Sequence, residues 1–271
     1  MGNASEQIEE RLLSYPHISE ITGKGLIFDK LAFDPYNRDC ELDLESDGEL
    51  TLAGVLLHSD SNVQFRCMIE HLEKWLELYP EYKTKQFGKK LGSNFFDYYS
   101  EIETYHRLRL SNCSPQIDPL IGLKNNRLDF RISLNEREIF IEVITPRPSV
   151  HSDNQFIEGY TGFFDFERGT IRERDRKSRL EIKIEEEIRH HLMDLPDSFQ
   201  TPIIIIANCT YCSLETGDPE IWFPIMQPQY LHGLLCYDFQ SKECTRYNSD
   251  FHVNPRYSLS TLEKGFFKAL F

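Results

Sequence analysis

The sequence predicts an α/β protein whose mixed β-sheet is flanked by helices, preceded by an α+β extension. Three observations predict this class. Residues 127–145 read as two strands joined by a short polar break, and residues 201–209 (TPIIIIANC) form an apolar, β-branched run typical of a strand buried on both faces. Between them, residues 168–194 have the pattern of a long helix.

The first part of the chain mixes expected helices with expected strands. A short helix is expected over 4–14 and a longer one over 61–79, where Ser59 to Asn62 supply a start signal and Pro80 a stop. The segment 25–56 contains apolar runs that we interpret as strands, including ELTLAGVLL. A basic connector ends near Gly92, so we expect an extension over 1–92 and a core over 93–271.

The core begins with an amphipathic helix over 93–110, whose stripe includes Phe95, Tyr99 and His106. We interpret His106 as a half-buried histidine of that stripe. The elements expected after this helix are a strand or loop at 115–123, the hairpin at 127–145, an irregular loop at 149–166, the helix at 168–194, strands at 201–209 and 232–239, a turn at 252–257 and a closing helix at 259–270.

Each strand of the hairpin carries one acid in an otherwise apolar pattern, Asp129 in the first and Glu142 in the second. With a two-residue loop at Asn135 and Glu136, Asp129 faces Glu142, and any even loop length keeps both on one side because the side-chain period is two. Like charges a few Å apart repel unless a cation lies between them, and carboxylates suit Mg²⁺ or Mn²⁺. The alternative is two solvent-facing acids on an edge hairpin.

The charge of the chain argues against generic nucleic-acid binding, because a net charge of −14 repels phosphate. The segment 168–183 is locally basic and could grip a nucleic-acid backbone. It could equally be a solvated helix with i,i+4 ion pairs. Its basic residues are Arg168, Arg172, Arg174, Arg176, Lys177, Arg179 and Lys183.

Scattered cysteines, seven in all, and a start without the pattern of a signal peptide lead us to expect a reducing cytoplasm. No run approaches the 18 apolar residues that would suggest a membrane span, so we expect no membrane association. Cys209, Cys212, Cys236 and Cys244 could form a zinc site, but their spacing favours small buried hydrophobic residues instead. P-loop, dinucleotide and nucleophile-elbow motifs do not occur.

Together these features resemble the PD-(D/E)XK nuclease superfamily, which has the restriction-endonuclease-like fold, over about residues 93–257. The resemblance rests on a helix with glutamates (SEIETYHRL), on Asp129 in RLDF, on Glu142 in IFIEVITP, and on the basic helix and apolar strand that follow. It implies metal-dependent hydrolysis of nucleic-acid phosphodiesters in restriction, repair or defence. DNA is favoured over RNA as the substrate, and a homodimer is one arrangement that we consider.

The resemblance also implies roles for particular residues. Asp129 and Glu142 would bind Mg²⁺ or Mn²⁺, with the carbonyl of Val143 as a third ligand. Glu101 or Glu103 would orient the metal or a water from the preceding helix. A cation held in this way polarises the phosphoryl oxygen and activates a bound water.

Two positions depart from the superfamily pattern. The proline before the aspartate is replaced by Leu128, and the lysine two places after the glutamate by Ile144. Lys124, Lys177 or Lys183 could supply the missing charge on a long, flexible side chain. Otherwise the site is inactive, and the fold serves as a module that binds nucleic acid or protein.

Two further motifs are interpreted structurally. His190 and His191 end the long helix, where the helix dipole favours imidazolium. Ser260 and Glu263 have the spacing of a capping box at the start of the closing helix.

Overall fold

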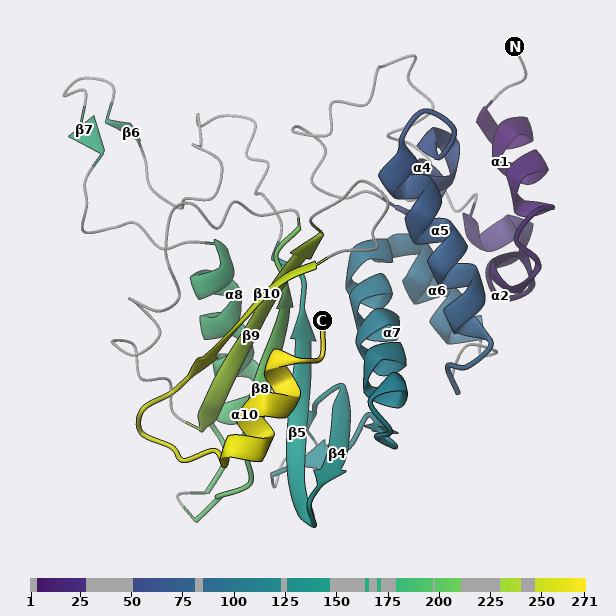
Figure 1. Cartoon of the computed structure of the whole chain (residues 1–271). Helices are drawn as coiled ribbons and strands as arrows, with labels where there is room; N and C mark the ends of the chain where they lie inside the picture. The colour runs from purple at the N-terminus through teal and green to yellow at the C-terminus, as the bar shows by residue number, and fades with distance from the viewer. Residues whose placement is uncertain are drawn as a thin grey trace. The chain divides into compact units, whose positions relative to one another are not determined.

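The computed structural model divides into two compact units, Met1–His106 with Phe239–Arg246 and Arg107–Asp238 with Tyr247–Phe271. Figure 1 shows the elements of each unit. The predicted division into 1–92 and 93–271 stays a prediction. The residues that the structure describes are 4–27, 51–80, 85–122, 126–146, 164–165, 170–171, 179–196, 198–210, 230–239 and 247–271.

The first unit is helical wherever it is described. The predicted helices near 4–14, 61–79 and 93–110 are confirmed, and Asn62 caps the second by accepting hydrogen bonds from the amides of Gln64 and Phe65. The helices are α1 (Ala4–Leu12), α2 (Pro16–Ile27), α4 (Leu52–His58), α5 (Val63–Leu76), α6 (Lys85–Ser93) and α7 (Phe95–Leu110), the last of which continues into the second unit.

The predicted strand ELTLAGVLL is wrong, because Leu52–His58 is helix α4. The Thr51 hydroxyl caps it by accepting a hydrogen bond from the amide of Gly54, which stabilises the first turn of a helix. The predicted strand beginning at 25 is also wrong where it is described, because 25–27 belong to α2. The rest of the predicted β region, residues 28–50, lies outside the described residues.

The second unit contains a six-stranded mixed sheet of order β1-β4-β5-β8-β9-β10. Strands β1–β4 and β4–β5 pair antiparallel, whereas β5–β8 and β8–β9 pair parallel. The strands of this sheet are β1 (Gln116–Ile117), β4 (Phe130–Leu134), β5 (Arg137–Ile144), β8 (Ile203–Asn208), β9 (Leu231–Phe239) and β10 (Tyr247–Val253). Two short two-stranded ribbons pair β2 (Leu120–Ile121) with β3 (Asn126–Arg127) and β6 (Phe164–Asp165) with β7 (Thr170–Ile171).

The hairpin has the register that the sequence predicts. Leu134 pairs with Arg137, and Phe130 pairs with Ile141. Asn135 and Glu136 form the two-residue loop with φ of 51° and 66°. Positive φ at both positions is the geometry of a type I′ turn, whose twist matches that of the strands.

Helices cover both faces of the sheet. On one face, Leu180 and Ile184 of α8 (Arg179–Glu187) share a core with Ile203 and Ile205 of β8. On the other face, Phe267 of α10 (Thr261–Lys268) stacks on Phe251 of β10, 5.3 Å between ring centroids. Figure 1 shows α8 and α10 on opposite sides of the strands. All six residues of β8 are buried, as the sequence predicts.

The predicted long helix is shorter than expected. Thr170–Ile171 is strand β7, so a helix beginning near 168 is wrong. Helix α8 begins at Arg179 and continues as the π-helical turn η3 (Ile188–Leu192). No helix in the described parts of the chain is both long and apolar enough to cross a membrane.

Candidate metal centre

The two hairpin acids lie side by side at the end of the β4–β5 ladder. The amide of Asp129 donates to Glu142 Oε2 at 3.3 Å, and the amide of Val143 donates to Asp129 Oδ2 at 2.7 Å. Each carboxylate therefore accepts a hydrogen bond from the backbone of the opposite strand, which orients both side chains. The predicted pairing of Asp129 with Glu142 is confirmed.

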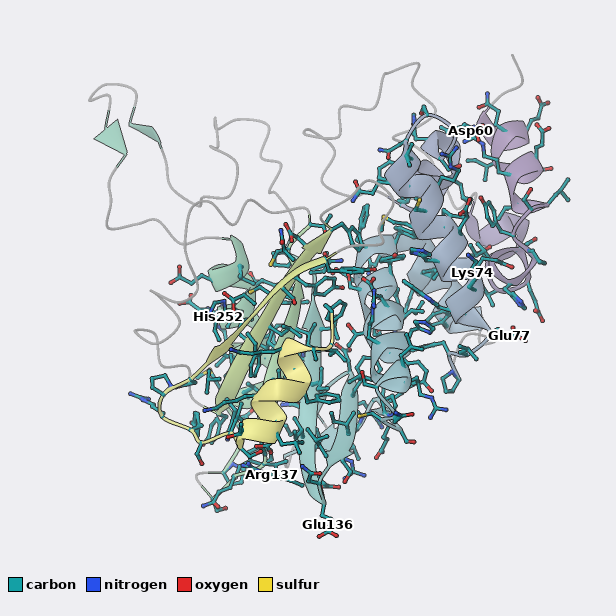
Figure 2. The ribbon with its side chains drawn as sticks, in the orientation of Figure 1. Asp60, Lys74, Glu77, Glu136, Arg137 and His252 are labelled. Atoms are coloured by element: carbon teal, nitrogen blue, oxygen red, sulfur yellow. The ribbon has the colours of Figure 1, made fainter. Side chains whose placement is uncertain are left out.

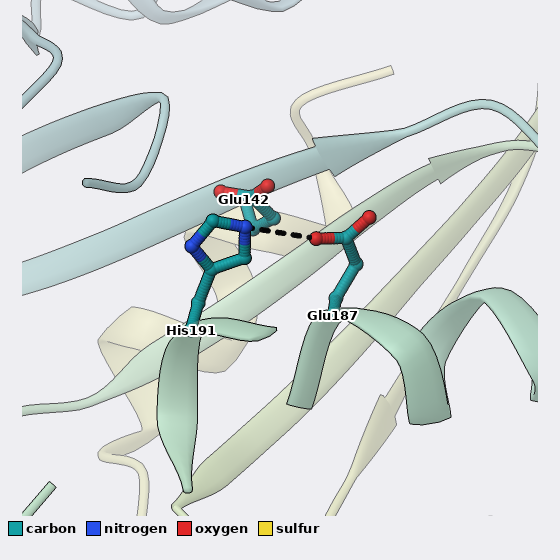
Figure 3. A group of neighbouring side chains, drawn as sticks. All are labelled: Glu142, Glu187 and His191. Atoms are coloured by element: carbon teal, nitrogen blue, oxygen red, sulfur yellow. Dashed lines mark ion pairs between the residues drawn. The ribbon is translucent and has the colours of Figure 1, made fainter. Parts of the chain in front are cut away.

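Two further residues, which the sequence reading did not select as ligands, meet Glu142 from the other side. Glu187 ends α8 and His191 lies in η3, and ligand atoms of Glu142, Glu187 and His191 all lie within 4.8 Å of one another. Figure 3 shows Glu142 on its strand, facing the other two on the helix. We refer to these three residues as the Glu142 cluster.

The local helix geometry brings His191 next to Glu187. His191 Nε2 lies 3.3 Å from Glu187 Oε2, one turn away at i,i+4. The π-helical turn is closed by a hydrogen bond from the amide of Met193 to the carbonyl of Ile188, at 3.0 Å. Such single π turns within α-helices occur frequently at functional sites. The histidine that we expected only to suit the helix end instead contributes to an acidic cluster.

A lysine neutralises part of this cluster. Lys183 Nζ lies 2.8 Å from Glu187 Oε1, again at i,i+4. Burial opposes ionisation of Glu187, but the bonds to His191 and Lys183 and their charges together outweigh it, so the pKa of Glu187 lies below its ordinary value. Glu187 is therefore a carboxylate at neutral pH, as a metal ligand must be.

The side chains that flank Glu142 on its own face of β5 are apolar. Phe140 and Ile144 lie on the same face of β5 as Glu142 and are buried in the core between the sheet and α8. Ile144 is 3% exposed, so the position where the superfamily has a lysine is filled by a core side chain. The nearby positive charge on the described helix comes from Lys183 instead.

The remaining predicted site residues are distributed as follows. Glu101 and Glu103 belong to the first unit, where Glu101 accepts a hydrogen bond from the Tyr79 hydroxyl and Glu103 is fully buried. Their action on the metal stays a prediction, as does the Val143 carbonyl ligand. Arg179 is the first residue of α8. Lys124, Arg168, Arg172, Arg174, Arg176 and Lys177 lie outside the described residues.

Other residues singled out in the sequence have structural surroundings. Cys209 and Cys236 are buried in the core beside α8, as expected of small hydrophobic residues. Their suggested zinc partners, Cys212 and Cys244, lie outside the described residues. His106 stacks on Trp75 in the first unit, 5.2 Å between ring centroids.

The donor set of the Glu142 cluster fits a divalent cation. Two carboxylates and one imidazole are ligands that Mn²⁺ and Zn²⁺ accept, whereas Mg²⁺ prefers oxygen alone. Asp129 adjoins Glu142 through its backbone amide, but its carboxylate is not among the ligand atoms that lie within 4.8 Å of one another. Of the two ions expected from the sequence, Mn²⁺ suits this donor set better, and its binding stays a prediction.

Comparison of the chain with protein-family models, with curated proteins and with solved structures finds no match.

Proposed function

We propose that this protein is a divalent-metal-dependent nuclease that hydrolyses nucleic-acid phosphodiesters at the Glu142 cluster, with Asp129 alongside. The observation that carries the proposal is the meeting of Glu142 from β5 with Glu187 and His191 from the helix that follows. Acids from separate elements converge in this way at a cost, because like charges repel. A cation between them offsets that cost.

The residues have separate roles in this proposal. Glu142, Glu187 and His191 would hold the cation, and Asp129, whose carboxylate accepts a hydrogen bond from the Val143 amide, would act beside them. When bound, the cation supplies Lewis-acid polarisation of the phosphoryl oxygen and activation of a water. Phe140 and Ile144, which flank Glu142 on β5, are buried in the core, and a partly apolar surrounding of this kind strengthens the interaction of a carboxylate with a cation.

We propose Lys183 as the replacement for the lysine missing at Ile144. It lies one helical turn before Glu187 and bonds to its carboxylate, so its charge is held beside the cluster. A flexible ammonium in that position can stabilise negative charge on the phosphoryl group as the bond breaks. The basic segment 168–179 is proposed to bind the phosphate backbone, with DNA as the favoured substrate.

The test is cleavage of plasmid, single-stranded DNA and RNA with Mn²⁺ or Mg²⁺. Glu142→Gln and Asp129→Asn preserve the size of each side chain and its ability to accept the observed backbone hydrogen bond, but remove the charge. Each is expected to lower the cleavage rate at least about 100-fold, the typical size of a lost electrostatic contribution. Glu138→Gln, an exposed acid of the same strand, is the matched control.

Cleavage that persists in both site variants would place the activity elsewhere and end the proposal. Cleavage lost equally in Glu138→Gln would indicate a general effect of charge on the hairpin.

One observation favours a second function, a metal-binding module without catalysis. Ile144 is packed in the core, so the position of the superfamily lysine cannot supply a charge without repacking. In this alternative the cluster binds Mn²⁺ but the chain cleaves nothing, and Lys183→Met changes no rate. If the wild-type protein binds Mn²⁺ but cleaves no nucleic acid, the metal-binding module is the correct function.

A further inference from the structure

A second site lies at the other end of the same β-strands. A cavity of about 450 Å³ opens there, with Arg137, Tyr230, His232, Arg256 and Tyr257 in its lining. Arg137 begins β5, and Tyr230 and His232 stand at the start of β9, so the cavity is at the amino ends of the parallel strands. Figure 2 labels Arg137 at this end of the sheet.

The cavity is separate from the Glu142 cluster. Glu142 is five residues beyond Arg137 along β5, which corresponds to about 17 Å at the usual rise of a strand. The two side chains also point to opposite faces, because side chains alternate along a strand.

We propose that this cavity binds a phosphate monoester of about mononucleotide size, with the phosphate on Arg137 and Arg256 and the organic part against the rings of His232 and Tyr257. The proposal is independent of nuclease activity, since it uses none of the residues of the Glu142 cluster.

Arg137 is positioned for an anion by a buried carboxylate. Its Nη1 donates to both oxygens of Glu263 at 3.1 and 3.2 Å, and Glu263 is itself 2% exposed. Glu263 is held in turn by the amide of Ser260, at 2.6 Å, in the predicted capping box. Nε and Nη2 of Arg137 have no hydrogen-bond partner among the described residues. One edge of the guanidinium is fixed and the other can bind a planar or tetrahedral anion.

His232 is placed by an irregularity in the sheet. Ile203 pairs with Leu231 and Ile204 pairs with Gly233, so His232 is an extra residue in β9. Bulges of this kind re-aim a side chain and are frequent beside functional sites. Tyr230, just before the strand, has a φ of 67°, which is unusual for a tyrosine. The backbone at this end of β9 is thus held in a conformation that its sequence does not favour locally.

Asn254 holds the irregular strand in place. Its side-chain amide donates to the carbonyl of Leu231 at 2.8 Å, and its backbone amide donates to the carbonyl of His232 at 3.0 Å. Its side-chain oxygen accepts from the amide of Arg256 at 3.0 Å. Asn254 is fully buried, so a single residue sets both the bulge and the turn that carries Arg256 and Tyr257.

The aromatic rings of His232 and Tyr257 form one wall of the cavity, and the His232 ring offers a polar atom to a ligand. His232 is 4% exposed and stacks on Tyr257, 4.1 Å between centroids. Its Nδ1 lies 2.9 Å from the carbonyl of Tyr230 and 3.4 Å from the amide of Ile203. In the tautomer that satisfies the shorter contact, Nδ1 donates to the carbonyl and Nε2 is an acceptor. Nε2 has no partner among the described residues, and the ring lines the cavity. A ligand hydroxyl or amino group would satisfy this nitrogen.

Together these features favour a phosphate monoester, in which a phosphate is attached to an organic group. A phosphate has three acceptor oxygens, which can use the free guanidinium edge of Arg137 and a second guanidinium from Arg256, whereas a carboxylate has two. The cavity volume lies within the usual range for sites of small organic ligands, about 300–1,000 Å³, and exceeds what a bare phosphate would fill. Tyrosine and histidine rings favour contact with a planar group.

The test is calorimetric titration of the full chain with AMP, adenosine, inorganic phosphate and hippurate, an aromatic carboxylate. AMP is expected to bind at least about tenfold more tightly than adenosine, inorganic phosphate or hippurate. Adenosine and hippurate lack the phosphate group, and inorganic phosphate lacks the organic group. Arg256→Gln and Arg137→Lys are each expected to weaken AMP binding by about tenfold or more. Arg137→Lys keeps a positive charge for Glu263, so folding is preserved while the guanidinium edge is lost.

Arg109→Gln removes an exposed arginine of α7 that is not part of the cavity and serves as the control. It is expected to bind AMP as the wild type does. Absence of AMP binding by the wild type, equal binding of adenosine or hippurate, or unchanged binding in both cavity variants would each overturn the proposal.

Discussion

Replacing Lys183 by methionine tests the charge balance of the Glu142 cluster. The substitution keeps an unbranched chain of similar length and removes the ammonium that lies 2.8 Å from Glu187 Oε1. Without it, His191 is the remaining basic side chain among the described residues that contacts Glu187, whose carboxylate lies beside that of Glu142. We expect the variant to be less stable than the wild type at neutral pH.

The magnitude follows from the separation of the two acids. Unit charges within 4.8 Å of one another repel by about 3.5 kcal/mol at an effective dielectric constant of about 20. The side chain of Lys183 is 38% exposed and that of Glu187 is 13% exposed, so solvent already screens part of the effect of the lysine. A loss of about 1–2 kcal/mol in the free energy of unfolding is expected.

The dependence on pH has a definite sign. Lys183 and His191 hold the pKa of Glu187 below its ordinary value, so this carboxylate stabilises the fold above the pKa of the unfolded state. That contribution is lost as the pH falls through the folded pKa, when Glu187 takes up a proton. The difference between wild type and Lys183→Met is therefore largest near neutral pH and shrinks in acid.

The assay is urea unfolding of both proteins at pH 7 and at successively lower pH. Mn²⁺ should stabilise the variant at pH 7 at least as much as the wild type, because the lysine no longer competes for Glu187. Lys268→Met, an exposed lysine of α10, is the control and should change stability by less than about 0.5 kcal/mol. A loss that is independent of pH, or equal in the control, would refute the reasoning.

Three further predictions concern the scaffold. Glu136→Gly should raise the free energy of unfolding by about 1 kcal/mol, because glycine tolerates the φ of 66° in the hairpin loop; a lower melting temperature would contradict this. Ser260→Ala should cost about 1 kcal/mol by removing the hydrogen bond to the amide of Glu263, and an unchanged urea midpoint would argue against the capping box. Ile205→Ala, at a fully buried position of β8, should cost about 2–5 kcal/mol, and a loss below 1 kcal/mol would show that this core is loosely packed.

The local sequence pattern predicted an element correctly where the burial of its apolar face fixes its position in the fold. The alternation around Asp129 and Glu142, with a two-residue loop, predicted the hairpin register correctly, because a shift by one residue would expose the core face. The apolar run of β8 likewise predicted a strand buried on both faces. In contrast, the short apolar run at 52–58 fits a strand and a helix equally, and the Thr51 cap favours the helix.

The cluster itself could be predicted only in part. Asp129 and Glu142 are neighbours because of local pairing, which a sequence pattern can indicate. Glu187 and His191 reach Glu142 because β5 and β8 are parallel and the intervening helix returns across the sheet, which is a property of the whole fold. The i,i+4 spacing of Glu187 and His191 was the available signal, and it is common to many solvated helices.

The bulge at His232 could not be anticipated from local sequence. It depends on the register between β8 and β9, which are far apart in the chain, and on the bonds of Asn254 to both sides of it. The sequence predicted a turn at 252–257, but not that Asn254 within it holds a neighbouring strand.

The metal centre itself is tested by calorimetric titration of Mn²⁺ into the wild-type protein and into Glu187→Gln. Glu186→Gln is the matched control. Glu186 is exposed and adjacent to Glu187 on the same helix, so the two variants differ in position but not in charge. We predict one Mn²⁺ per chain for the wild type and for Glu186→Gln, and affinity reduced at least about tenfold in Glu187→Gln. Equal affinity in the two variants, or no binding by the wild type, would contradict the assignment of Glu142, Glu187 and His191 as a metal centre.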